Sequence, residues 1–277
     1  MSASGTVARP GAGRTWTRAV MGSVASLRLV TADPSPTAAR RVAACFAELA
    51  RVEEIFSPFL PTSDISRIRR GEIQIADAHR LVAEVACECR DAEVATDGRF
   101  SAWRDGRFDP TGYVKGWAVE RAAARHLTPL LEEDGCHAVG LSVGGDMQLL
   151  TAEGSDWTWR VGIPDPASPT EMLATLEVTR GAVATSGSAE RGRHIVDPRS
   201  GEGVTGVASA TVMSQGLAHA DVWATAAIVA GFDDLSWLAR ARTTTGLLVS
   251  DDGRTRRWLG STEVSLQPAG PFGQASR

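Results

Sequence analysis

The sequence predicts a single α+β domain with a mainly antiparallel sheet and flanking helices. Helix-like segments dominate the first half of the chain, and short strand-like segments follow one another in the second half. This order favours an antiparallel sheet, because a doubly wound parallel sheet would alternate strands and helices along the chain. No repeat, low-complexity linker or break in composition divides the sequence, so we expect one domain.

Helices are expected where apolar side chains recur every three or four residues. In the clearest case Val42, Phe46 and Leu49 follow the breaker cluster around Pro34 and Pro36. The expected helices cover 36–56, a short piece within 57–71, 77–95, 112–133 with a bend at Pro129, and 214–230.

Strands are expected where apolar and polar residues alternate. The turn Gly144-Gly145-Asp146 joins two such runs into a hairpin over 136–151. The stretch 96–110 is rich in turn-forming residues and separates two of the helices. The expected strands lie in 21–32, 136–151, 157–163, 174–178, 181–185, 207–212, 247–250 and 258–264.

The ends of the chain differ in composition from its body. Residues 1–18 are rich in Gly, Ser, Thr, Arg and Pro and predict a flexible leader. We expect the folded domain over 19–267 and a flexible tail over 268–277. The apolar piece 19–27 is too weak for a secretory signal, and no stretch approaches the length of a membrane span.

Composition and charge exclude several classes of protein. The chain has 277 residues, of which 43% are hydrophobic and 22% charged, and this is ordinary globular make-up. A net charge of -4 without a Lys/Arg-rich run argues against a nucleic-acid partner. The four cysteines have neither C-x-x-C nor zinc-finger spacing, so we expect thiols in a reducing cytoplasm.

The sharpest local motif is Ala-Asp-Val-Trp-Ala-Thr at 220–225. Asp221 and Thr225 are four residues apart on a predicted helix and therefore share a face. A carboxylate and a hydroxyl suit a hard cation such as Mg²⁺. The alternative is that Asp221 caps the helix or stays solvated.

A second motif, Phe-Asp-Pro-Thr-Gly-Tyr-Val-Lys-Gly-Trp at 108–117, runs from a turn into a helix. Backbone N–H groups at a helix start bind phosphates, and Lys115 would add a positive charge. A capped helix with a solvated lysine explains the same residues without a ligand.

Two further motifs lie between expected strands. The turn in Leu-Ser-Val-Gly-Gly-Asp at 141–146 permits a close backbone approach, or is an ordinary hairpin turn. Hydroxyls, arginines and the pair His194 and Asp197 lie close together in 184–201. Arginine and serine suit phosphate contacts, and His194 is either an acid/base or a structural histidine.

In this order, these motifs resemble those of the ApbE-type FAD:protein FMN transferases. The resemblance covers about 21–231 and would make 19–267 a flavin transferase domain. It is carried by the matching segments Met-Gly-Ser at 21–23, FSPFLPTSDISRI, TDGRFSAW, FDPTGYVKGWAVE, LSVGGD, WRVGIPDP, ATSGSAERGRHIVDPRSG and HADVWATAAIVAG.

The resemblance implies roles for individual residues. The metal, Mg²⁺, would be held by Asp221, Thr225 and the backbone carbonyls of Gly112 and Ala224. His194 is implied as acid/base, with Asp221 also in the catalytic set. The residues implied to contact FAD are Met21, Phe59, Arg99, Phe100, Ser101, Asp109, Lys115 and Ile195.

The implied reaction moves FMN from FAD onto a Thr or Ser hydroxyl of an acceptor protein and releases AMP. The sequence departs from the family at Ser101, which is often acidic, at Phe59, which is often Tyr, and at Ser188-Ala189, which are often Asp-Tyr. Three alternatives stay open: Mg²⁺-dependent hydrolysis of FAD to FMN and AMP, a non-catalytic FAD-binding protein, and an unrelated α+β domain.

Overall fold

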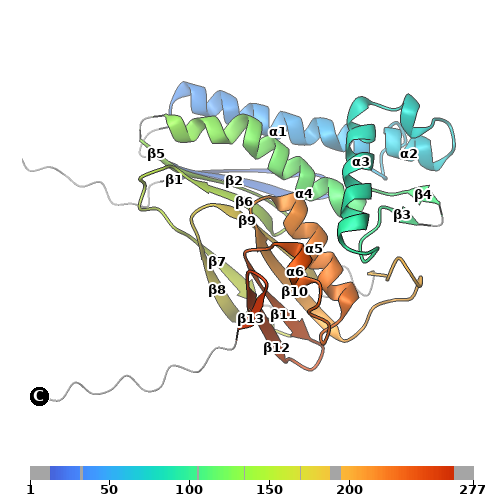
Figure 1. Ribbon diagram of the computed structural model, residues 1–277. Coiled ribbons are helices and arrows are strands. Elements are labelled where there is room, and N and C mark those ends of the chain that lie inside the picture. The colour runs from blue at the N-terminus through green and yellow to red at the C-terminus, as the bar shows by residue number, and fades with distance from the viewer. Residues whose placement is uncertain are drawn as a thin grey trace, which may run out of the picture.

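A nine-stranded sheet forms the centre of the fold (Figure 1). The computed structural model describes residues 13–31, 34–104, 106–133, 135–168, 170–187 and 195–264. All neighbouring strands of the sheet are antiparallel, so the expected α+β class is confirmed. In spatial order the strands are β1 Gly13–Val20, β2 Ser23–Thr31, β5 Cys136–Val143, β6 Asp146–Thr151, β9 Gly181–Gly187, β10 Val207–Ser214, β11 Thr245–Ser250, β12 Thr255–Leu259 and β13 Thr262–Val264.

Helices cover one face of this sheet (Figure 1). Alternate strand residues such as Leu27, Leu141 and Val212 point to this side and join the largest hydrophobic core. The covering helices are α1 Pro36–Phe56, α4 Thr111–Ala122 and α5 Leu217–Ala230. At one end lie the 3₁₀ turn Ile75–Asp77, α2 Asp64–Arg69, α3 Arg80–Ala95 and the small hairpin of β3 Trp103–Arg104 and β4 Arg107–Phe108.

A separate hairpin packs on the opposite face of the sheet. It consists of β7 Trp159–Pro164 and β8 Met172–Val178, which pair only with each other among the described strands. Trp159 packs in a core with Leu149, and Gly140 leaves room for its ring, since a Cβ there would lie 3.1 Å from it. The strands were predicted, but nothing in their sequence indicates that they leave the main sheet.

The predicted leader 1–18 is wrong for its last six residues. Gly13–Val20 pairs with β2 in continuous register, and Met21 and Gly22 close the hairpin with φ values of 55° and 66°. The strand is mostly exposed at the edge of the sheet, so it lacks the apolar alternation that predicts a strand. Residues 1–12 and the predicted tail 268–277 lie outside the described residues.

The predicted helix 112–133 is shorter than expected. α4 ends at Ala122, and a π turn, Ala123–Leu127, and a 3₁₀ turn, Thr128–Glu132, follow it. Pro129 cannot donate a backbone hydrogen bond and disfavours helical geometry in the residue before it. The α-helix therefore ends several residues before the proline, whereas only a bend at Pro129 is predicted from the sequence.

The helix predicted over 214–230 begins at Leu217, because Ser214 ends β10. Three tryptophans anchor the helix. Trp223 stacks on Trp237 with ring centroids 5.7 Å apart, and Trp237 meets Trp258 of β12 edge-on at 5.2 Å. α6 Leu238–Ala241 follows this cluster, and the ring of His219 is hydrogen-bonded to the Ala241 carbonyl.

Among the described residues, no helix combines the length and the apolar character that crossing a membrane would require.

Gly246 of β11 tests this packing, because Trp258 lies directly over it. A Cβ on Gly246 would clash with the Trp258 ring and come within 2.5 Å of the Thr211 carbonyl oxygen. We expect Gly246→Ala to lower the free energy of unfolding by about 3 kcal/mol in chemical denaturation. Gly203→Ala is the matched control, since nothing lies within 4 Å of its added Cβ. Equal stability of the two variants would contradict this packing.

Candidate active site

The close contact between α4 and α5 brings the predicted motifs together (Figure 1). Gly116 of α4 is buried and faces the first turns of α5. A Cβ at Gly116 would lie 3.1 Å from the Leu217 carbonyl oxygen, 3.2 Å from Ala218 Cα and 3.3 Å from Asp221 Cβ. The glycine therefore lets the two backbones approach, with Asp221 at the contact.

Glu120, one turn further along α4, binds the start of α5. Its carboxylate accepts a hydrogen bond of 3.0 Å from the backbone N–H of Ala218. This contact satisfies a donor that an isolated helix start leaves free, and the negative charge suits the helix dipole. Glu120 thus faces 216–218 and Gly116 faces 217–221, so the two helices run antiparallel at this contact.

Asp221 and Thr225 lie on α5, as predicted, one turn apart. The Asp221 side chain is only 8% exposed, on a helix whose other buried residues are apolar. The Thr225 hydroxyl is 3.0 Å from the Ser186 hydroxyl of β9. A carboxylate and hydroxyl oxygens on neighbouring elements form the oxygen-rich surroundings that a hard cation prefers.

No cluster of three or more His, Cys, Asp or Glu with metal-site geometry occurs in the described part of the chain. A metal near Asp221 would therefore be held by one carboxylate together with neutral oxygens. The donor set fits Mg²⁺, which binds through few protein ligands and completes its shell with water and substrate phosphates.

Lys115 forms an ion pair with Asp146, the first residue of β6. Asp146 is 2% exposed, and its other oxygen accepts a 3.0 Å hydrogen bond from the backbone N–H of Thr185. The buried carboxylate therefore connects α4, β6 and β9. A buried charge is tolerated when it is paired and hydrogen-bonded, as here.

The loop before β3 packs against the start of α4. Phe100 is 4% exposed, and its ring is 6.2 Å from that of Tyr113. A Cβ on Gly112 would be 3.6 Å from the Phe100 ring, so these two predicted residues are neighbours. Burial, followed by a 2.7 Å hydrogen bond to Glu88, raises the pKa of Tyr113, which keeps its phenol protonated.

Three polar residues predicted to bind FAD have partners within the protein. The Ser101 hydroxyl accepts a hydrogen bond of 3.1 Å from the Trp103 N–H. Asp109 accepts bonds from the Thr111 N–H and hydroxyl at the start of α4 and pairs with Arg69 at 2.6 Å. Arg99 pairs with Asp234 at 3.0 Å.

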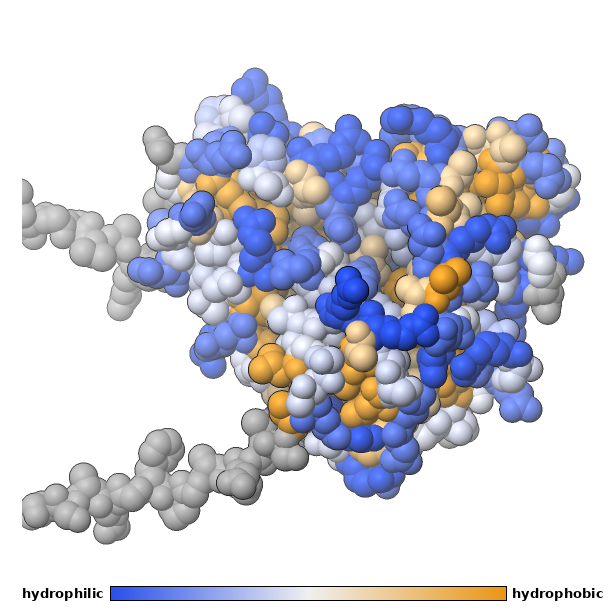
Figure 2. All heavy atoms as spheres, viewed as in Figure 1, coloured by the Kyte–Doolittle hydropathy of each residue, from blue (hydrophilic) through white to orange (hydrophobic). Residues whose placement is uncertain are grey.

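The remaining predicted residues are spread more widely. Met21 lies in the β1–β2 turn and packs against the main core. Ile195, which follows β9 in the chain, packs against the same core. Phe59 lies between α1 and α2, and at 87% exposure it makes none of the site contacts described above. On the face of the molecule drawn in Figure 2, the apolar surface is broken into small patches among hydrophilic residues. The predicted acid/base His194 lies outside the described residues.

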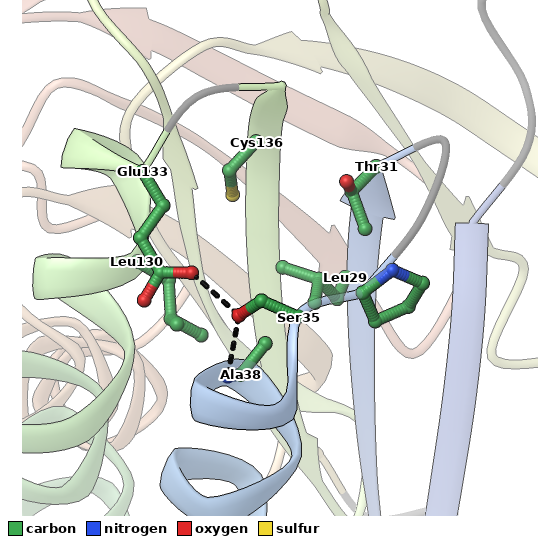
Figure 3. A pocket seen from close by; sticks show the side chains of 8 residues that line it. Leu29, Thr31, Ser35, Ala38, Leu130, Glu133 and Cys136 are labelled. Carbon is green, nitrogen blue, oxygen red and sulfur yellow. Dashed lines mark hydrogen bonds between the residues drawn. The ribbon is translucent and has the colours of Figure 1, made fainter.

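Two hollows in the described structure lie away from these residues. One, of about 240 Å³ including its mouth, is at the start of α1 (Figure 3). The Ser35 hydroxyl there caps α1 and donates a 2.9 Å bond to Glu133. Cys136, the first residue of β5, lines this hollow, whereas the turn that leads to Asp146 follows the last residue of β5. The hollow is therefore at the far end of β5 from Asp146. The second lies under the β7–β8 hairpin, on the sheet face away from the helices.

Sequence reasoning missed three residues that the geometry adds to the site. In the sequence, Asp146 belongs to the turn motif at 141–146 and Ser186 to the hydroxyl-rich stretch 184–201, but no individual role is predicted for either residue or for Glu120. Asp146 follows two glycines directly, and its place next to Lys115 depends on pairing between distant strands. The only feature of the sequence that points to Asp146 is its position directly after the two glycines of the Gly-Gly-Asp motif.

Comparison with known proteins identifies the family. The family model described as "ApbE family" matches residues 102–248, more than half of the chain, including α4, β6, β9 and α5. The chain belongs to the ApbE family. The matched range contains Lys115, Asp146, Ser186, Asp221 and Thr225.

Curated relatives of this ApbE-family chain carry the name FAD:protein FMN transferase. That of Escherichia coli (strain K12) is 26% identical over 151 residues, covering 50% of this chain and 43% of the relative. That of Rhodobacter capsulatus is 34% identical over 156 residues, covering 53% of this chain and 29% of the relative. The matched part is thus less than half of either relative.

Solved structures share the fold over a larger part of the chain. The ApbE protein of Thermotoga maritima has a TM-score of 0.74 at 19% identity and covers 89% of this chain and 97% of its own. The flavinyl transferase ApbE of Pseudomonas stutzeri, in its apo form, has a TM-score of 0.69 at 20% identity, with coverages of 88% and 93%. At such identities the similarity establishes the ApbE-like fold.

The buried Lys115–Asp146 pair makes a testable contribution to stability. Asp146→Asn keeps the shape of the side chain but removes its charge, and we expect a loss of about 2 kcal/mol in urea denaturation. The control is Asp252→Asn, because Asp252 pairs with Arg254 at a side-chain exposure of 62%. An exposed pair contributes little to stability, because water screens its charges. A cost at Asp146 no larger than at Asp252 would contradict the assignment.

Proposed function

We propose that this chain transfers FMN from FAD to a Thr or Ser hydroxyl of an acceptor protein and releases AMP. The observation that carries the proposal is the α4–α5 contact, where Gly116 brings the backbone of α4 against Asp221. The curated relatives are named FAD:protein FMN transferase, and these names support the transfer of FMN from FAD to a protein. The acceptor protein and FAD are both substrates of this reaction.

The proposed metal set is Asp221, Thr225 and the backbone carbonyls of Gly112 and Ala224. Gly112 is one turn before Gly116, so the antiparallel register of the helices directs it toward the 224–225 end of α5. When bound, Mg²⁺ would supply positive charge that neutralises the pyrophosphate of FAD. The buried Asp221 carboxylate and the neighbouring Thr225 and Ser186 hydroxyls support the proposal, because a hard cation prefers oxygen ligands.

The protein groups proposed around FAD have distinct tasks. Lys115, oriented by Asp146, would add a positive charge near the phosphates at the start of α4. Phe59, whose ring is exposed, is available to stack on a flat ring of FAD. The other proposed FAD contacts are Met21, Arg99, Phe100, Ser101, Asp109 and Ile195.

The proposed chemistry is a phosphoryl transfer. The acceptor hydroxyl oxygen forms a bond to the phosphorus of the FMN half, and the bond from that phosphorus to the bridging oxygen breaks. The bridging oxygen leaves with AMP, and the hydroxyl proton passes to a base, which we propose to be His194. Such a reaction depends mainly on positioning and charge neutralisation, and in this proposal Lys115 and the bound Mg²⁺ would supply the positive charge.

We also propose that the protein works in the cytoplasm. All four cysteines are free thiols in the structure, and Cys45 and Cys89 are buried. Desolvation raises the pKa of the Cys45 thiol to about 12, so it stays protonated and unreactive. Unpaired structural thiols are typical of a reducing compartment.

The test is AMP release from FAD in the presence of Mg²⁺, with and without a flavin-acceptor protein. We expect release that depends on the acceptor, together with a fluorescent acceptor band that survives denaturation. Release without an acceptor would instead identify an FAD hydrolase. Bound FAD without AMP release in either case would leave a flavin-binding protein and overturn the catalytic proposal.

Asp221→Asn removes the charge of the proposed metal ligand while keeping its shape. We expect the rate of acceptor-dependent AMP release to fall about 100-fold or more, because a site of this kind acts through charge stabilisation. Asp252→Asn, on the β11–β12 turn, should retain the wild-type rate. Unchanged Mg²⁺-dependent activity of Asp221→Asn would rule out the metal site.

A further inference from the structure

Three aspartates and three arginines from distant parts of the chain meet beside the proposed site. We name this cluster the ionic clamp. It joins the end of α3, the segment 195–204 and the segment from α5 to α6. Its members are Asp97, Arg99, Asp197, Arg199, Asp234 and Arg240.

Arg99 is the innermost member of the ionic clamp. Its side chain is 14% exposed and lies 3.0 Å from Asp234 and 3.6 Å from Asp97. Arg240 of α6 pairs with the same Asp97. Asp97 directly follows the C-cap of α3 and has a φ of 51°, in the left-handed region that residues other than glycine seldom adopt.

The segment 195–204 presents the second half of the clamp. It folds back on itself through a bridge between Val196 and Gly203. Inside it, Asp197 binds Arg199 through two side-chain bonds of 2.7 and 2.9 Å. The Arg199 stem packs over Gly98, where an added Cβ would be 3.4 Å from Arg199 Cγ.

The charges of the two halves act on each other. The hydrogen bond from Arg199 lowers the pKa of Asp197, and the charge of Arg99 lowers it further. The pKa of Arg199 is raised first by Asp197 and then by Asp234 and Asp97. Each half thus stabilises the charged form of the other, which favours the docked position of 195–204.

We infer that the ionic clamp positions the segment 195–204 against the end of α3. Ile195, the first residue of this segment, is a proposed FAD contact, so the inference rests in this respect on the proposed function. Arg199 is a positioning residue: it acts on FAD through the placement of Ile195. Loss of its charge releases the segment and weakens FAD binding.

The test compares Arg199→Gln with Arg254→Gln. Arg254 is a matched control, because it also pairs with an aspartate two residues earlier, Asp252, but lies in the β11–β12 turn. The first readout, amide hydrogen exchange, needs no activity. We expect the hydrogen-bonded amides of Asp197 and Val204 to exchange about tenfold faster in Arg199→Gln than in wild type or Arg254→Gln.

The second readout is steady-state AMP release in the presence of acceptor. We expect the KM for FAD to rise about tenfold in Arg199→Gln, with kcat nearly unchanged, because misplaced contacts weaken binding. A merely destabilised protein would instead lose kcat at constant KM, since fewer molecules are active. Arg199→Lys keeps the charge and should recover most of the KM.

If the amides of Asp197 and Val204 exchange at the wild-type rate in Arg199→Gln, the inference that the ionic clamp holds 195–204 in place is wrong. Faster exchange with an unchanged KM would overturn its role in FAD binding. If wild-type protein releases no AMP, the proposed function fails, and the exchange comparison alone then decides whether the clamp holds 195–204 in place.

Discussion

The close approach of α4 and α5 at Gly116 is the contact on which the candidate site depends. A side chain at this position would be crowded, because its Cβ would lie 3.1 Å from the Leu217 carbonyl oxygen and 3.3 Å from Asp221 Cβ. Glu120, one turn further along α4, adds to the same contact by accepting a hydrogen bond from the backbone N–H of Ala218 in the first turn of α5. The two helices therefore carry the Lys115 ammonium and the Asp221 carboxylate on one rigid unit.

The rest of the fold holds this helix pair in place. The antiparallel sheet supplies Asp146 and Ser186, each of which binds one of the helices. The tryptophan cluster of Trp223, Trp237 and Trp258 ties α5 to the far strands. The β7–β8 hairpin packs on the opposite face of the sheet, whereas the proposed site lies on the face that carries the helices.

Much of this arrangement was predictable from local sequence. The period of Val42, Phe46 and Leu49 predicts α1, and the four-residue spacing of Asp221 and Thr225 predicts their shared face. The edge strand β1 was missed, because its residues are mostly exposed and carry little apolar alternation. Asp146, Ser186 and Glu120 were missed because their partners are 31 to 98 residues away, and strand register cannot be deduced from spacing.

The affinity of Gly116→Ala for FAD, followed by flavin fluorescence, tests the central claim most directly. An added methyl group requires α5 to shift by a few tenths of an ångström relative to α4, because three α5 atoms would lie 3.1 to 3.3 Å from the new Cβ. Circular dichroism verifies that the fold is retained. If the helix contact builds the FAD site, the dissociation constant rises about tenfold or more, although residue 116 itself is not a proposed FAD ligand. A folded Gly116→Ala protein that binds FAD as tightly as wild type would contradict the account.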